Sequence, residues 1–118
     1  MSNMRPVLCL DFDGVLHSYK SGWKGADVIP DEPVPGAQEF VRNALVHFDV
    51  VVYSSRSHQT GGISAMRKWM QEHDFPSGIV FAKYKPSAHV TIDDRGLQFT
   101  GEWPGMQELL NFEPWNKR

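Results

Sequence analysis

The sequence has very little cysteine: Cys9 is the only one among 118 residues. A single cysteine excludes a disulfide scaffold and a metal site made of several thiolates, and it fits an intracellular, reducing compartment. Long apolar runs are also missing near the N-terminus, where the stretch from Val7 to Leu10 is followed at once by two aspartates. This pattern matches neither a signal peptide nor a membrane span, so we expect a cytoplasmic protein with no membrane partner.

An excess of charge of either sign is missing as well. Lysine and arginine total 12 against 14 aspartates and glutamates, which gives a formal net charge of -2. The charge balance therefore gives no support to a nucleic-acid partner, although a local basic cluster would still allow one. The length fits a single compact domain over residues 1–118 and is too short for two ordinary ones.

The sequence does contain a series of apolar runs that end in polar residues. The run from Val7 to Leu10 is continuously apolar rather than alternating, which is typical of a central strand in a parallel sheet. Two similar runs lie at 50–53 and 89–92, and a shorter one follows turn residues at 79–81. We expect each of these runs to form a strand.

Helical patterns lie between the apolar runs. Apolar residues recur at helical spacing over 36–48 and 61–73, and we expect a last short helix over 105–110. Strands that alternate with helices indicate an α/β fold, and we predict a three-layer, Rossmann-like sandwich with a central, mainly parallel sheet and helices on both faces. The segment 17–36 is rich in glycine and proline and has no clear period, so we expect a functional flap or a loop there.

Polar residues gather where the predicted strands end. In open α/β sheets, ligands bind outside the carboxyl ends of the strands, so we expect these residues to meet at one site. They are Asp11, Asp13, Ser54, Lys85, Asp93 and Asp94. Several carboxylates at one edge would repel one another unless a cation joined them, and oxygen ligands of this kind suit Mg²⁺.

A magnesium site of this type favours a phosphoryl ligand. Mg²⁺ that is bound by one or two carboxylates keeps open positions for a phosphate oxygen. The ammonium group of Lys85 and the hydroxyl of Ser54 are suitable partners for the other phosphoryl oxygens. The sequence therefore predicts a phosphorylated substrate, and a nucleic-acid end, a nucleotide, a phosphoprotein and a sugar phosphate all fit.

The order of these motifs resembles that of the haloacid dehalogenase (HAD) superfamily of phosphohydrolases. An apolar strand precedes DFDGV at 11–15, a second one precedes Ser54, a lysine follows, and a last apolar strand precedes an aspartate pair. The resemblance covers most of the chain. It implies a Mg²⁺-dependent phosphomonoester hydrolase in which Asp11 is the nucleophile and becomes an aspartyl phosphate. Asp13 would be the general acid and then the general base.

The resemblance also implies which residues bind the phosphate. Ser54 matches the strand-end serine of the family, with Ser55 as the less favoured alternative, and Gly14 would lie beside the phosphate. Lys85 is followed by a proline and matches the motif lysine better than Lys83 does. The spacing from this lysine to the aspartate pair is short for the family.

The metal ligands implied by the resemblance are Asp11, Asp93 and Asp94, together with Asp13, which would bind mainly through its backbone carbonyl. This division leaves the side chain of Asp13 free to carry protons. Gly14 is expected to let the chain turn sharply away from the first strand.

Neither insertion point of this family holds enough chain for a cap domain. The first holds only the segment 17–36, and one helix and one short strand fill the chain between Ser54 and Lys85. We therefore expect a small, capless member with an open site. Such members act on macromolecular phosphates or form homo-oligomers in which a neighbouring subunit covers the site.

Three residues next to the motifs are candidates for contacts with the substrate beyond its phosphate. Arg56 and Arg95 directly follow motif residues, and His17 lies shortly after the first motif. The alternative interpretation is an ordinary surface salt bridge for each arginine and an ordinary loop position for the histidine.

Two other functions stay open. A signalling receiver domain also uses acidic residues, Mg²⁺, a serine or threonine and a lysine to handle an aspartyl phosphate. Its acidic pair comes first, however, whereas this chain has DFD first and the aspartate pair last. The third hypothesis is a non-catalytic module that keeps the HAD fold and binds phosphate or Mg²⁺ without turnover.

Overall fold

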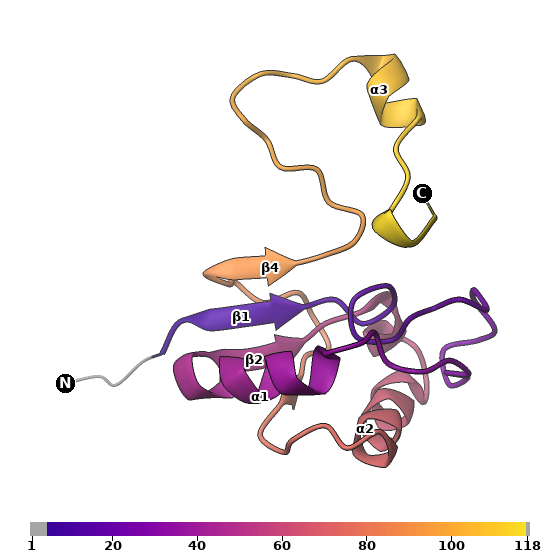
Figure 1. Cartoon of the computed structure of the whole chain (residues 1–118), viewed down its shortest axis with the longest axis vertical. Coiled ribbons are helices and arrows are strands. Elements are labelled where there is room, and N and C mark those ends of the chain that lie inside the picture. The colour runs from indigo at the N-terminus through magenta and orange to yellow at the C-terminus, as the bar shows by residue number, and fades with distance from the viewer. Residues whose placement is uncertain (1–4, 118) are drawn as a thin grey trace.

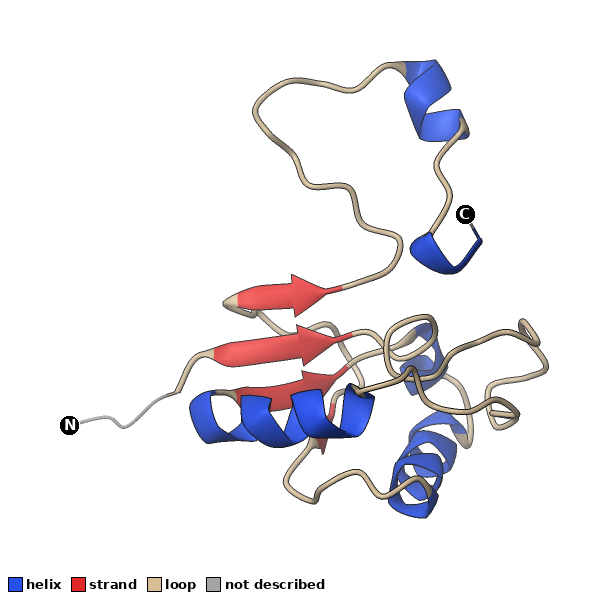
Figure 2. Ribbon diagram, in the orientation of Figure 1, coloured by secondary structure: helices blue, strands red, loops and turns tan. Residues whose placement is uncertain are grey.

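The computed structural model describes residues 5–117, and its elements follow the order expected from the sequence. Four strands form one parallel sheet in the order β3-β2-β1-β4 (Figures 1 and 2). The strands are β1 (Val7–Leu10), β2 (Asp49–Val52), β3 (Val80–Phe81) and β4 (Val90–Ile92). The helices are α1 (Ala37–His47), α2 (Gly62–Glu72) and α3 (Met106–Leu110), with short 3-10 turns η1 (Ser55–His58) and η2 (Trp115–Lys117).

The small α/β fold with a parallel sheet is therefore confirmed. The predicted strands and helices agree with the observed ones to within one residue at each end. Within residues 5–117, no helix combines the length and the apolar content that crossing a bilayer requires.

One hydrophobic core lies against one face of the sheet. The parallel register pairs Leu8 with Val50 and Leu10 with Val52, so these four side chains point to the same face, and all are buried. Both longer helices contribute to this core, and their buried members are Val41, Ala44, Met66, Trp69 and Met70. A three-layer sandwich with helices on both faces stays a prediction.

The segment 17–36, which we call the flap, contains no helix or strand. Isolated bridges join His17 to Asp13 and to Pro33, and so bring the two ends of the flap together. Tyr19 has a φ of 61°, a left-handed conformation that is uncommon for a residue with a side chain and that is often found at functional sites. The flap lies beyond the carboxyl end of β1 (Figure 1).

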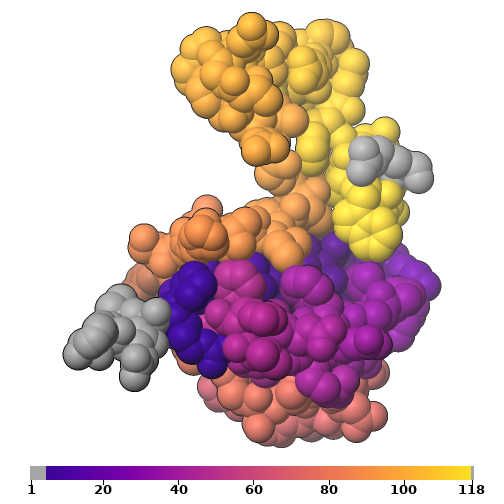
Figure 3. Space-filling view, turned by 60° about the vertical axis from the view of Figure 1, so that its left-hand side comes forward, coloured from indigo at the N-terminus to yellow at the C-terminus, as the bar shows by residue number. Residues whose placement is uncertain are grey.

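The chain after β4 leaves the body and then returns to it. Residues 97–112, which we call the arm, stand away from the sheet and include α3 (Figures 1 and 3). The radius of gyration is 15.2 Å, against about 13.5 Å expected for a compact domain of this length. After the arm, Trp115 in η2 donates a hydrogen bond from Nε1 to the carbonyl of Gly14 at 2.8 Å. This contact brings the C-terminal segment beside the carboxyl edge of the sheet.

Candidate active site

Three carboxylates meet at the carboxyl ends of β1 and β4. Because these strands are parallel neighbours, the residues that follow them, Asp11 after β1 and Asp93 and Asp94 after β4, lie at the same edge. The three side chains each offer an oxygen within 4.8 Å of the others, a spacing that could hold one metal ion. The backbone N–H of Asp11 donates to the carbonyl of Ile92 at 3.0 Å, which fixes the nucleophile candidate to the end of the sheet.

This cluster raises the pKa of Asp11 to about 8. Burial of the carboxyl group is the largest cause, followed by its hydrogen bond with Asp94, and the nearby charges of Asp93 and Asp94 act in the same direction. The backbone N–H of Phe12, 2.8 Å from Oδ1, opposes the shift. A negative charge on Asp11 is therefore unfavourable unless a cation is nearby, and a set of carboxylate oxygens is what Mg²⁺ prefers.

Gly14 fits this place for two reasons. Its φ of 82° lies in the left-handed region, so the chain turns sharply away from β1, as predicted. A Cβ atom at this position would also overlap the carboxylate of Asp94. Glycine therefore lets the turn after β1 approach the acidic cluster closely.

The side chain of Asp13 lies apart from the three clustered carboxylates and is held by two other residues. Arg56 donates from Nε to Oδ2 at 2.9 Å and to Oδ1 at 3.2 Å, and its Nη2 donates to Oδ1 at 3.1 Å. Nδ1 of His17 lies 2.9 Å from the same Oδ1. The sequence predicted a free side chain at Asp13, whereas the structure holds this partly buried side chain by hydrogen bonds to two fully buried residues.

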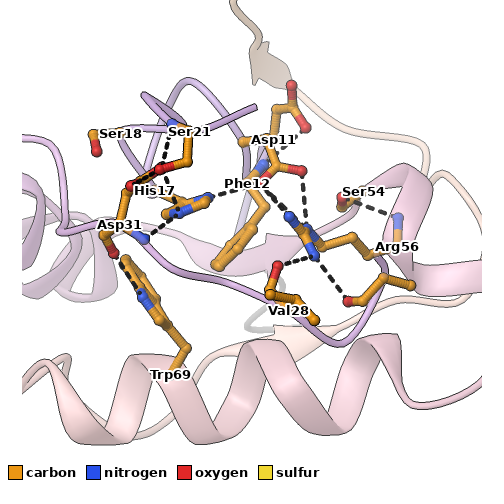
Figure 4. Close-up of polar contacts among 12 residues, drawn as sticks. Asp11, Phe12, His17, Ser18, Ser21, Val28, Asp31, Ser54, Arg56 and Trp69 are labelled. Carbon is orange, nitrogen blue, oxygen red and sulfur yellow. Dashed lines mark hydrogen bonds and ion pairs between the residues drawn. The ribbon is translucent and has the colours of Figure 1, made fainter. Parts of the chain in front are cut away.

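Arg56 is the centre of this network. Its side chain is completely buried, and Nη1 donates to the flap carbonyls of Gly25 and Ala26 at 2.8 and 2.9 Å. It also donates to the carbonyl of Val28 at 3.2 Å (Figure 4). The ring of Trp23 lies over the guanidinium, with 4.7 Å between Cζ and the ring centroid. Both interpretations from the sequence need correction, because Arg56 is neither a surface salt bridge nor exposed to a substrate.

His17 is the second buried partner of Asp13, with an exposed fraction of zero. The backbone N–H of Asp31 donates to its Nε2 at 3.1 Å (Figure 4). The hydrogen of a neutral ring therefore lies on Nδ1 and is donated to Asp13. Trp69 donates from Nε1 to the carbonyl of Asp31 at 3.1 Å and packs edge-on against His17. Burial excludes direct contact with a substrate in this conformation, so His17 is a positioning residue for Asp13.

Two neighbouring hollows open at this edge of the sheet. The first, which we call the lysine hollow, has a volume of about 260 Å³ and includes Lys85 and Asp93 in its lining. The second, the flap hollow, has a volume of about 190 Å³ and is lined by Asp13, the flap and the C-terminal segment. Four residues line both hollows, and they are Asp11, Ser54, Ser55 and Arg95. Asp11 therefore lies where the two hollows meet.

Three of the four predicted phosphate-binding residues, Ser54, Ser55 and Lys85, line these hollows, whereas Gly14 lines neither. The Ser54 hydroxyl caps η1 by accepting the backbone N–H of Arg56 at 3.1 Å, and its own hydrogen is left to donate elsewhere. Ser55 is exposed in the same place. Lys85 lines the lysine hollow, whereas Lys83 lines neither hollow.

Sequence reasoning missed the C-terminal contribution to the site. Pro114, Asn116 and Lys117 line the flap hollow, opposite the flap residues Tyr19 and Trp23. No motif or periodicity marks these residues in the sequence. Their contact with the flap joins distant parts of the chain, since Nδ2 of Asn116 donates to the carbonyl of Ser18, 98 residues earlier.

Comparisons with known proteins add no relative. No model of a known protein family matches the chain, and no curated protein matches its sequence.

Proposed function

We propose that this chain is a Mg²⁺-dependent phosphomonoester hydrolase that acts through an aspartyl phosphate on Asp11. The observation that carries the proposal is the carboxylate cluster, in which Asp11, Asp93 and Asp94 each place an oxygen within 4.8 Å of the others. Ser54 and Lys85 line the hollow beside it. The order of these residues along the chain supports a small, capless HAD-type protein with a Rossmann-like sheet.

Asp11, Asp93 and Asp94 would hold the metal, with the backbone carbonyl of Asp13 as a further ligand. When bound, Mg²⁺ supplies positive charge that neutralises the carboxylates and stabilises the charge on the phosphoryl oxygens. Ser54 and Lys85 would hold the other phosphoryl oxygens from the lysine hollow.

The carboxylate of Asp11 attacks phosphorus, and the bond between phosphorus and the alcohol oxygen breaks. Asp13 gives its proton to that oxygen, and then takes a proton from the water that attacks the aspartyl phosphate. Inorganic phosphate leaves and Asp11 is regenerated.

The test is hydrolysis of p-nitrophenyl phosphate with and without Mg²⁺. Asp11→Asn should lose at least about a thousandfold in kcat, because the nucleophile is removed. Asp49→Asn is the matched control, since this exposed aspartate begins β2 at the opposite edge of the sheet. Acid quenching followed by mass spectrometry should find a phosphoryl group on the peptide that contains Asp11. An Asp11→Asn protein that hydrolyses the substrate at the parent rate would refute the proposal.

A second candidate is a non-catalytic module that binds phosphate or Mg²⁺. The ion pair between Arg56 and Asp13 favours it, because the carboxylate proposed to move protons is already engaged by a fully buried guanidinium. Calorimetry that detects Mg²⁺ binding, together with no turnover of a broad panel of phosphorylated compounds, would support this candidate over the hydrolase.

A further inference from the structure

The flap hollow is lined differently from the lysine hollow. Asp13 lines the flap hollow and Lys85 lines the lysine hollow, while Asp11 borders both. In the proposed reaction the alcohol oxygen must lie beside Asp13, which protonates it, and the other phosphoryl oxygens lie toward Lys85. The alcohol part of the substrate therefore occupies the flap hollow.

Two cationic side chains, Arg95 and Lys117, line this hollow. Within residues 5–117, neither forms an ion pair with a carboxylate, although both lie near the acidic cluster. Arg95 stays close to the site because its backbone N–H donates to Oδ1 of Asp93 at 2.7 Å, and its guanidinium lies 5.9 Å from the ring centroid of Phe112. The hollow thus presents two cations that are available to an anion.

The segment that carries Lys117 is fixed to the turn after β1 and to the flap. Trp115 donates to the carbonyl of Gly14 at 2.8 Å, and Nδ2 of Asn116 donates to the carbonyl of Ser18 at 3.3 Å. Oδ1 of Asn116 is buried and has no hydrogen-bond partner among the described residues. A buried acceptor without a partner is costly.

We propose that the flap hollow is a leaving-group subsite in which Arg95 and Lys117 select phosphomonoesters whose alcohol carries a second anionic group. This inference rests on the proposed function, because it needs the scissile phosphate beside Asp11. A volume of about 190 Å³ suits a sugar or a similar small alcohol. The flap rings of Tyr19 and Trp23 lie against the same space. The group that Arg95 and Lys117 would bind is a second phosphate on that alcohol. Either a nucleotide or a sugar phosphate carries such a group.

The test compares matched substrates in the presence of Mg²⁺. Adenosine 3′,5′-bisphosphate is compared with adenosine 3′-monophosphate and 5′-monophosphate, and glucose 1,6-bisphosphate with glucose 6-phosphate. In at least one set, the second phosphate should raise kcat/KM about tenfold, since two exposed cations contribute modestly each. The set that shows the effect identifies the nucleotide or the sugar phosphate as the source.

Variants then assign the effect to its residues. Lys117→Met and Arg95→Met should each reduce the bisphosphate preference at least about threefold. Lys68→Met, an exposed lysine on α2 that lines neither hollow, is the control and should leave the preference unchanged. A preference below about twofold in both sets, or one that neither variant reduces, overturns the inference. If p-nitrophenyl phosphate is still hydrolysed, the proposed function survives.

Binding provides a readout that does not depend on turnover. If no compound is hydrolysed, the proposed function fails. The inference is then tested by calorimetry with Mg²⁺, which compares the Kd of each bisphosphate with the Kd of the matched monophosphate. A tighter bisphosphate complex that Lys117→Met weakens supports an anion subsite in the flap hollow. Equal Kd values for the matched compounds refute it.

Discussion

Arg56 and Asp13 form an ion pair in which Nε lies 2.9 Å from Oδ2 and the arginine side chain is completely buried. The same guanidinium holds three flap carbonyls through Nη1. One side chain therefore connects the turn after β2, the turn after β1 and the flap. The residue proposed to carry the proton cannot be moved without disturbing the flap.

Replacement of Arg56 by methionine should destabilise the protein by about 3–5 kcal/mol. The substitution leaves Asp13 partly buried without its cation and removes the donor of three flap carbonyls. Urea unfolding measures the change. Arg42→Met on the exposed surface of α1 is the control, and it should stay within about 0.5 kcal/mol of the parent. An Arg56→Met protein within about 1 kcal/mol of the parent would show that the buried pair does not stabilise the fold.

Without divalent cations, stability should fall as the pH rises from about 4 to about 8. The pKa of Asp11 is about 8 in the folded chain, against an ordinary value of 3.8. In this range the folded chain holds a proton that the unfolded chain has lost, so stability decreases with pH. Thermal unfolding at a series of pH values without Mg²⁺ measures the trend, and Asp11→Asn should flatten it.

Mg²⁺ should reverse this trend. A cation bound by Asp11, Asp93 and Asp94 favours the charged form of the cluster, so the gain in Tm on adding Mg²⁺ should grow from pH 5 to pH 8. Ca²⁺ and Na⁺ titrations serve as comparisons for specificity. A gain that is the same at all pH values, or that persists in Asp11→Asn, would place the cation elsewhere.

Most of the fold could be predicted from the sequence because its elements are marked by local patterns. The continuous apolar run of β1 and the helical spacing in α1 and α2 are visible in short windows of chain. The meeting of Asp11 with Asp93 and Asp94 also followed, because residues after parallel strands share one edge of the sheet.

The environment of Arg56 could not be predicted in this way. An arginine after a strand is ordinarily exposed, and its burial here depends on flap carbonyls about thirty residues away. The C-terminal wall of the flap hollow was missed for the same reason. Trp115 and Lys117 reach the site only because the arm returns to the body, and no local pattern encodes that return.

Trp115 offers a direct test of that return. Trp115→Phe removes the N–H that donates to Gly14 and should release the C-terminal segment from the turn after β1, at a cost of about 1 kcal/mol. Hydrogen exchange of the amides near Gly14 and of η2 should become faster. Trp103→Phe is the control, because this side chain is 85% exposed in the arm and should change neither stability nor exchange near the site. Equal exchange in the two variants would contradict the anchoring role of Trp115.

Alanine variants of two glycines can distinguish the cost of a left-handed backbone from the effect of a side chain placed against the acidic cluster. Gly14 and Gly22 both have left-handed φ values, 82° and 75°, so alanine should cost about 1–2 kcal/mol at either position. A Cβ at Gly22 meets nothing within 4 Å, whereas a Cβ at Gly14 overlaps the Asp94 carboxylate.

Gly14→Ala must therefore displace Asp94 from the cluster, and it should weaken Mg²⁺ binding at least about tenfold by calorimetry, because one carboxylate is lost or misplaced. Gly22→Ala should bind Mg²⁺ as the parent does. Equal affinities in the two alanine variants would mean that Asp94 is not a ligand, and the metal site would then have to rest on Asp11 and Asp93 alone.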